Sequence, residues 1–183
     1  MPELSFARQP EQARAELQAG FGDAMAELAS GVAVITARAE GGAPCGLLVT
    51  SLCSYSRRPP SILVSIDRAR RSHDPLVACE HFGTHLLGRD QASLARLFAA
   101  PVEDRFRELP WQWDTDVPVL PDVIAYLRCR REAVFAHGDH SILLGEVTEI
   151  RVAPREPLCY LRRRMDWRVQ EDPISAAVDA AGR

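Results

Sequence analysis

The sequence predicts a mainly β fold with peripheral α-helices: an antiparallel barrel with helices at its rim. About six short segments rich in β-branched residues follow one another with few helices between them. This order argues against alternating βαβ units and favours antiparallel pairing. The 183 residues suffice for one domain with a full hydrophobic core.

A helix is expected over residues 11–30, followed by Gly31 as a C-terminal stop. Its apolar side chains fall on one stripe, formed by Leu17, Phe21, Met25 and Leu28. Strands are expected next over residues 31–37, 45–56 and 61–67. The double proline Pro59-Pro60 marks a bend between the last two, since it cannot lie inside a central strand.

Two short helices are expected in the middle of the chain. Asp74 is the N-cap of a helix over residues 74–80, with Pro75 at its first helical position. Asp90 caps a second helix over residues 91–99, whose inward side chains are Leu94, Leu97 and Phe98. A strand over residues 82–87 separates them.

The rest of the chain predicts an irregular surface loop over residues 101–120, under which Trp111 and Trp113 pack. Long strands over residues 123–136 and 141–152 are joined by a turn-like hairpin connection, and residues 157–163 can add a last strand. We divide the chain into an N-terminal extension (1–10), the barrel domain (11–169) and a flexible C-terminal tail (170–183).

Composition limits the partners and the compartment. The formal net charge of −3 argues against nucleic acid as the main partner, although the basic run at residues 68–71 can hold a phosphate or two. No apolar run is long enough to span a membrane, and residues 1–10 do not form a secretory signal. The five cysteines include no CxxC pair, so we expect a reduced, cytoplasmic protein.

Several well-known sites are absent. The sequence holds no GxGxxG after a strand and no GxxxxGK[ST], HExxH or GxSxG motif. His137, Asp139 and His140 share a glycine turn, but two histidines without a third ligand are weak support for a metal site. We expect no metal.

Small hydroxyl residues gather at the expected strand ends: Thr50, Ser51, Ser54, Ser56, Ser65 and Ser72. Taken singly they are ordinary strand-edge and cap residues. Ser72-His73, however, stands beside a helix start, where free backbone amides can bind an anion. The group therefore favours a cofactor that carries phosphate.

Seven motifs follow one another along the chain: ASGVAVITA (29–37), GLLVTSLCSYSRRPPSILVSID (46–67), SHDPL (72–76), LARLF (94–98), PVL (118–120), GDH (138–140) and PLCYLR (157–162). In their order and spacing, which are specific, they resemble the flavin reductase-like group of the flavin-binding split barrels. Within that group the chain is most similar to the short reductase components of two-component flavin-dependent monooxygenases. The resemblance runs from Phe21 to Tyr160.

The resemblance implies a six-stranded antiparallel Greek-key split barrel that forms a homodimer, with flavin near the subunit interface. It also implies an NAD(P)H:flavin oxidoreductase that reduces FAD or FMN and supplies reduced flavin to a separate monooxygenase, in antibiotic biosynthesis or aromatic degradation. We favour NADH over NADPH, since no arginine is clearly placed for a ribose phosphate. Hydride transfer between two cofactors needs neither a nucleophile nor a metal.

The resemblance also assigns the site residues. The flavin ring is expected along Val49, Thr50, Ser51 and Ser54, its ribityl chain beside Ser65, Ile66 and Asp67, and its phosphate at Ser72 and His73. The turn of Gly138, Asp139 and His140 is expected to meet the nicotinamide, with His140 in the catalytic role.

The chain departs from the usual family pattern at Leu48, at Arg57-Arg58, at His85 and in RRMDW near its end. His85 leaves one contact to the flavin in doubt. A non-enzymatic flavin carrier or redox sensor on the same barrel is the alternative. The GDH turn discriminates between the two, because a carrier has no need of a histidine facing nicotinamide.

Overall fold

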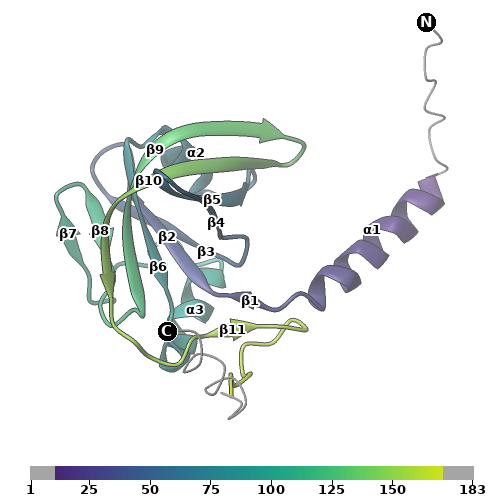
Figure 1. Ribbon diagram of the computed structural model, residues 1–183. Coiled ribbons are helices and arrows are strands. Elements are labelled where there is room, and N and C mark those ends of the chain that lie inside the picture. Colours follow the sequence, from purple (N-terminus) through teal and green to yellow (C-terminus); the bar gives the residue numbers. More distant parts are fainter. Residues whose placement is uncertain (1–10, 171–183) are drawn as a thin grey trace, which may run out of the picture.

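Seven antiparallel strands form the main sheet, in the order β3-β2-β6-β9-β10-β5-β4 (Figure 1). They are β2 (Ala33–Arg38), β3 (Pro44–Val49), β4 (Cys53–Arg57), β5 (Pro60–Asp67), β6 (His81–Leu86), β9 (Ala125–His137) and β10 (His140–Val152). Strand β3, at one end of this order, also contacts β5 near the other end, so the sheet curls towards a barrel. The mainly β, antiparallel fold is confirmed. This computed structural model describes residues 11–170; the expected extension and all of the tail except Gln170 lie outside the described residues.

The main sheet has seven strands where six were expected, because residues 45–56 are not one strand. Pairing of β3 ends at Val49, and β4 begins at Cys53 on the opposite edge of the sheet. Residues 50–52 carry the chain between these edges. The bend at Pro59-Pro60 is confirmed, since β4 and β5 pair on either side of it.

The core consists of two groups of buried side chains on opposite faces of β2, with Ile35 in one group and Val34, beside α3, in the other. Strand β2 is buried over most of its length, as its run of β-branched and small residues predicts. Each fully buried aliphatic side chain contributes about 1.5–3 kcal/mol relative to an exposed one. Gly145 of β10 gives this core its closest packing, because an added Cβ would lie 2.7 Å from Cε1 of the Phe82 ring.

Helix α1 (Glu11–Ala26) leaves the body of the molecule instead of packing on it (Figure 1). It ends four residues before the expected end, since Ser30–Gly31 forms β1 and pairs with β11 (Cys159–Tyr160). Gly31 is therefore a strand residue, not a helix stop. The apolar stripe is exposed, with Phe21 64% accessible, and ion pairs from Arg162 to Glu27 and from Arg163 to Asp23 lie at its base.

The two rim helices begin differently from the prediction. Helix α2 (His73–Ala78) has Ser72 as its N-cap residue, so Asp74 lies in the first turn. There its negative charge interacts favourably with the helix dipole. The 3₁₀ turn η1 (Arg89–Gln91) includes Asp90 and leads into α3 (Ala92–Ala99). The Gln91 side chain accepts a hydrogen bond from the Gly88 amide, which serves as the cap instead.

The expected loop over residues 101–120 contains a small hairpin, β7 (Gln112–Asp114) and β8 (Val117–Val119). Thr115, with φ 59°, makes its tight turn. Trp111 packs under the segment as predicted and donates a 3.1 Å hydrogen bond to the Phe106 carbonyl. Strands of three residues carry too little periodicity to be found from the sequence.

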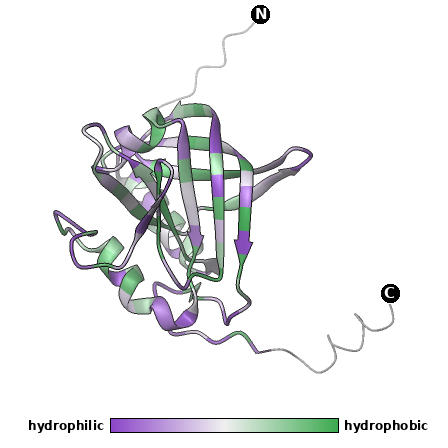
Figure 2. Cartoon of the chain, turned by 90° about the vertical axis from the view of Figure 1, so that its left-hand side faces the viewer, coloured by the Kyte–Doolittle hydropathy of each residue, from purple (hydrophilic) through white to green (hydrophobic). Residues whose placement is uncertain are grey.

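The β9–β10 hairpin is the longest element and extends past the rest of the sheet (Figures 1 and 2). Gly138, with φ 58°, makes its turn, as the sequence predicts. The last predicted strand, over residues 157–163, shrinks to β11. No helix among the described residues is long and apolar enough to cross a membrane.

Candidate active site

Pairing of β5 with β10 brings two of the predicted groups together. His140 lies opposite Asp67, and Ile142 lies opposite Ser65. The Arg68 amide donates a 2.9 Å hydrogen bond to the Asp139 carbonyl, which fastens the hairpin turn to the end of β5. The sheet thus places the GDH turn beside the segment predicted to flank the flavin.

The third group joins them through Ser51. Its hydroxyl donates a 2.7 Å hydrogen bond to the Ser65 carbonyl, which holds the connection between β3 and β4 against β5. Thr50, Ser51 and Ser54 are all exposed. Val49, the last residue of β3, is buried and anchors the segment from below.

An apolar shelf, formed by Ile142 of β10 and Phe135 of β9, lies on the outer face between these groups. Ser65 of β5 continues the same row on the other side of Ile142. Ile142 is 39% and Phe135 59% exposed. The neighbouring residues Ile66 and Ser141 are buried, since successive side chains of a strand alternate between faces.

The shelf changes the prediction in two ways. The Ile66 side chain points into the core, so only its backbone can meet a ligand on the outer face. Ile142 and Phe135 were missed, because a lone apolar residue on a long strand has no distinctive motif. The alternation of exposed and buried positions in β10 that reveals them is a property of the structure and not of the sequence.

His140 is accessible at the hairpin, with its side chain 44% exposed. Its Nδ1 lies 2.8 Å from Oδ1 of Asp139, and this hydrogen bond holds the pKa of the Asp139 carboxyl below its usual range. The pairing orients the imidazole while leaving the ring open to a ligand.

Ser72 and His73 are placed differently from the prediction, because both side chains are buried. The Ser72 hydroxyl donates to the Gly46 carbonyl at 2.9 Å. His73 bonds through Nε2 to the Ser141 hydroxyl at 2.9 Å and through Nδ1 to Asp74 at 2.7 Å. These contacts tie α2 to β3 and β10 and engage both side chains within the protein, although Ser72 also lines two small hollows.

Arginines lie beside Ser72. Arg70, Arg71 and Arg105 line two small adjoining hollows of about 210 and 200 Å³. Burial, and the positive charges of Arg71 and Arg70, lower the pKa of Arg105. The sequence marked the basic run at residues 68–71 but gave no reason to bring Arg105 from the distant loop.

His85, the doubtful flavin contact, is completely buried beside Tyr126. Its Nδ1 lies 3.1 Å from the Val34 carbonyl, and desolvation lowers its pKa from 6.5 to about 4. A neutral core histidine does not reach a ligand on the outer face. The departure at this position therefore concerns the core and not the site.

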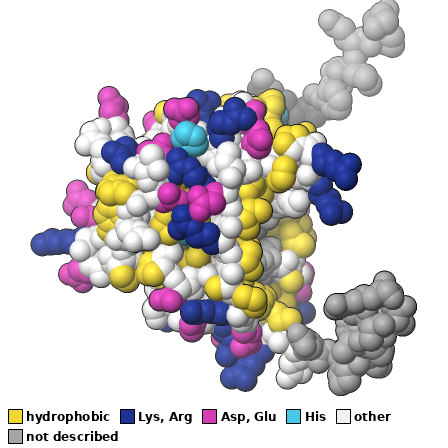
Figure 3. All heavy atoms as spheres, turned by 60° about the vertical axis from the view of Figure 1, so that its left-hand side comes forward, with side chains coloured by type: hydrophobic (Ala, Val, Ile, Leu, Met, Phe, Trp, Pro, Cys, Tyr) yellow, Lys and Arg dark blue, Asp and Glu magenta, His cyan; other side chains and the backbone are white. Residues whose placement is uncertain are grey.

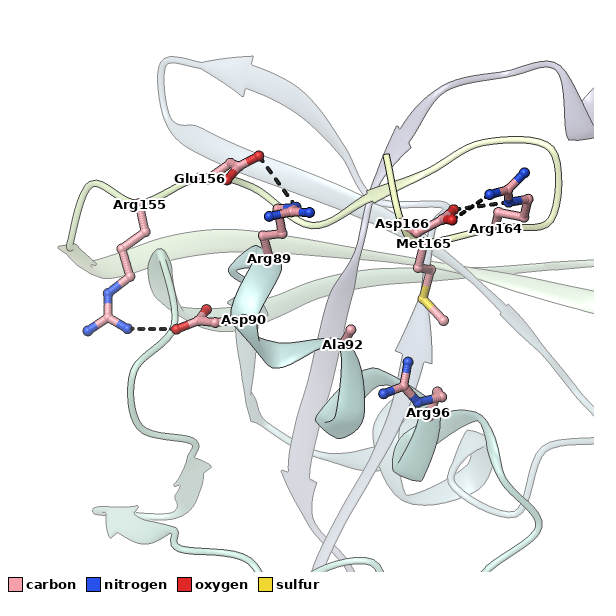
Figure 4. Close-up of a pocket in the computed structure, with 9 residues that line it drawn as sticks. All are labelled: Arg89, Asp90, Ala92, Arg96, Arg155, Glu156, Arg164, Met165 and Asp166. Carbon is pink, nitrogen blue, oxygen red and sulfur yellow. Dashed lines mark hydrogen bonds and ion pairs between the residues drawn. The ribbon is translucent and has the colours of Figure 1, made fainter. Parts of the chain in front are cut away.

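A larger hollow, of about 860 Å³, lies elsewhere, among η1, α3 and the segment from Arg155 to Asp166 (Figure 4). None of the predicted site residues lines it. Most of its charges are paired, as in Arg89 with Glu156 and Arg155 with Asp90, both at 3.5 Å. Within residues 11–170, no cluster of three metal-binding side chains occurs.

Basic and acidic side chains are interspersed on the face seen in Figure 3, with apolar ones between them. That face carries no extended basic patch of the kind that binds a phosphate backbone. The arginines beside Ser72 form a local basic group instead.

The chain is similar to known proteins over most of its length. The family model described as flavin reductase like domain matches residues 25–167. A flavin reductase (NADH) of Kitasatospora aureofaciens is 39% identical, with 86% of this chain and 85% of that protein covered. The reductase component of a 4-nitrophenol 4-monooxygenase/4-nitrocatechol 2-monooxygenase of Rhodococcus opacus is 35% identical, with 80% and 79% covered.

Solved structures share the fold. An NADH:FAD oxidoreductase of Streptomyces globisporus, solved with NAD and FAD fragments, superposes with a TM-score of 0.75 at 26% identity. The match covers 91% of this chain and 98% of that one. Some relatives are longer: the chain spans 51% of one from Rhizobium meliloti.

Proposed function

Because the chain belongs to the flavin reductase-like family, we propose that it is an NADH-dependent flavin reductase acting on FAD or FMN. The chain would hold a flavin and a reduced nicotinamide together; the flavin would supply the hydride-accepting ring and, once reduced, would serve a separate monooxygenase. One observation carries the proposal: the Ser51–Ser65 contact, the apolar shelf and the GDH turn lie together where β5 ends and β10 begins.

The residues present fit an isoalloxazine ring. The shelf of Ile142 and Phe135 supplies apolar surface, and pairing of β3 ends before Thr50 and Ser51. Backbone amides at those two positions can therefore donate to the polar edge of the ring, where negative charge gathers on reduction. Ser54 extends this polar side, while the Val49 side chain supports it from the core.

The neighbouring strand fits the ribityl chain. Ser65 and Asp67 lie on the outer face of β5, and the Asp67 carboxylate already accepts a 2.9 Å hydrogen bond from the Ala69 amide. We assign the backbone of Ile66, together with these two residues, to the flavin. Ser72 and His73 shape the phosphate region through Gly46 and Ser141 rather than by direct contact.

His140 is assigned to the nicotinamide. Gly138 and Asp139 form the turn that presents it, and the hydrogen bond to Asp139 fixes the ring. Its work is binding and orientation, because hydride transfer depends on the distance and angle between the two rings. Hydride transfer needs no general base from the protein.

The exposed stripe of α1 supports a homodimer. Leu17, Phe21 and Met25 follow one another at helical spacing, and no contact within the described chain covers them. An isolated helix of this length is marginal in water unless its apolar face is buried. A second copy, related by two-fold symmetry, would bury it.

The supply of reduced flavin to a partner oxygenase fits the Rhodococcus opacus relative, which is the reductase component of a monooxygenase. All five cysteines are free thiols, which fits a reducing cytoplasm. Antibiotic assembly and aromatic degradation are the settings we propose for such a pair.

Steady-state oxidation of NADH and of NADPH, with FAD, FMN and riboflavin in turn, tests the proposal. NADH consumption should require added flavin, and NADH should be used better than NADPH. Absence of turnover with every flavin would leave the carrier as the remaining function. Turnover by flavin-free protein would contradict a reaction that passes through flavin.

A further inference from the structure

Two hollows continue from the ring site along β3. The first is lined by Leu47 and Leu48, just before the ring-binding segment, and the second by Pro44, Cys45 and Gly46, further back on the same strand. At a rise of about 3.3 Å per residue, Pro44 lies roughly 16 Å from Val49. A long ligand held at Thr50 and Ser51 would thus pass both hollows in order.

Two arginines stand in the wall that both hollows share, next to buried Ser72. Arg71 donates to the carbonyls of Val102 and Glu103, and Arg105 donates to the Ala100 carbonyl at 2.9 Å. These bonds hold the guanidinium groups in place without neutralising them. Neither arginine has a carboxylate partner within residues 11–170.

Arg105 also has an unused donor. Its Nε is buried and has no hydrogen-bond partner in the described structure. A buried donor without a partner costs free energy, and so does crowding of like charges. An anion placed between Arg71 and Arg105 would relieve both.

We propose that Arg71 and Arg105 bind the diphosphate of FAD, and that the enzyme therefore prefers FAD to FMN. The inference rests on the proposed function, because it takes the flavin ring to lie at Thr50 and Ser51. FMN carries only one phosphate and would reach the first hollow alone. Planar guanidinium groups suit a diphosphate, since each can donate two parallel hydrogen bonds to its oxygens.

The far hollow suits the adenosine of FAD. Its apolar lining includes Ala39, Pro44 and Phe106, which can cover a purine or ribose. Glu103 and Asp104 also line it, and carboxylates accept hydrogen bonds from ribose hydroxyls. These two acids oppose an anion, so the diphosphate belongs at the arginine wall and not deeper.

The test compares Michaelis constants for FAD, FMN and riboflavin in the wild type and in Arg105→Gln and Arg71→Gln. The wild type should favour FAD over FMN. Each variant should raise the constant for FAD about 10-fold, that for FMN less, and that for riboflavin not at all. Arg107→Gln is the matched control, because Arg107 is exposed on the same loop, lines neither hollow and loses the same charge.

ADP provides a readout without turnover. Calorimetric titration should show ADP binding to the wild type and to Arg107→Gln, and about 10-fold weaker binding to Arg105→Gln and Arg71→Gln. Unchanged riboflavin turnover and melting temperature would show that the variants fold. A wild type that favours FMN, or an equal loss for all three flavins, would overturn the inference while leaving the reductase activity standing.

NADH is the other diphosphate in the reaction. Variants that raise the Michaelis constant for NADH, with riboflavin as acceptor, and not that for FAD would overturn the assignment to FAD. Failure of the proposed function looks different: no flavin would be reduced, whereas ADP binding would still report on the two arginines.

Discussion

The Ser51 hydroxyl, in the connection between β3 and β4, donates a 2.7 Å hydrogen bond to the Ser65 carbonyl of β5. Fourteen residues separate the two serines along the chain. The bond fixes the segment that crosses from β3 to β4 at the place where the flavin ring is proposed to lie.

Ser51→Ala should therefore weaken flavin binding more than it weakens the fold. Loss of one partly exposed hydrogen bond costs about 1 kcal/mol of stability at most, and the freed segment should raise the flavin dissociation constant several-fold. Fluorescence quenching measures the constant. Ser93→Ala, at an exposed position of α3, is the control. Equal effects of the two changes on flavin binding would contradict the assignment.

His140→Ala should raise the Michaelis constant for NADH and slow hydride transfer by about 10-fold, because one positioning contact is lost. Flavin affinity and melting temperature should change little, since the side chain is exposed and bonds only to Asp139. Stopped-flow reduction of bound flavin separates the two steps. Normal NADH kinetics in the mutant would remove His140 from the site.

Burial of His85 makes the stability of the fold depend on pH. Its pKa is lowered to about 4 in the folded protein, so the unfolded chain takes up a proton from pH 6.5 downwards and the folded chain does not. Stability is full above that pH and falls by up to about 3 kcal/mol as the pH drops to 4. Urea unfolding at pH 7.5 and pH 5 measures the fall.

His85→Asn is the control for this effect, because the amide can still donate to the Val34 carbonyl but does not titrate. The variant should lose part of the acid sensitivity between pH 6.5 and pH 4. If it kept the full dependence, other groups would be responsible.

Gly145→Ala should destabilise the fold by about 1–3 kcal/mol, because the added methyl group meets the buried Phe82 ring. Thermal unfolding measures the loss. Gly41→Asn provides a contrast, since Gly41 has open space and a positive φ that asparagine tolerates. A neutral Gly145→Ala would mean that Phe82 can move aside.

Phe21→Glu should convert the dimer to a monomer, because it places a charge in the middle of the exposed α1 stripe. Light scattering gives the mass directly, against 20.3 kDa for one chain. Ala19→Glu, which places the same charge on the opposite, exposed face of the helix, should stay dimeric. A wild type that is already monomeric would contradict the proposed assembly.

Sequence patterns predicted what depends on local chemistry. Runs of β-branched residues predicted the strands, and Gly138 between two such runs predicted the hairpin. The break inside residues 45–56 escaped notice because the apolar pattern continues through Leu52 and only the pairing partner changes. The predicted range of helix α1 was too long for the same reason, since Ser30 pairs with a distant strand and does not continue the helix.

The candidate site was predicted where neighbouring strands carry it and missed where remote loops do. Ser65 and His140 are partners of adjoining strands, whereas Arg105 enters from a loop far along the chain. Ser72 lines the two small hollows beside the arginines, but its burial could not be predicted. The direction of a hydroxyl depends on tertiary neighbours such as the Gly46 carbonyl.

The register of β5 against β10 has a consequence for how such a chain can change over time. Insertion of a single residue between His140 and Ser141 would turn Ser141 outward and send Ile142 into the core. Point substitutions can retune this surface one side chain at a time. Changes of length within the strand are tolerated only in pairs, so new variants of this surface should arise by replacement and rarely by insertion.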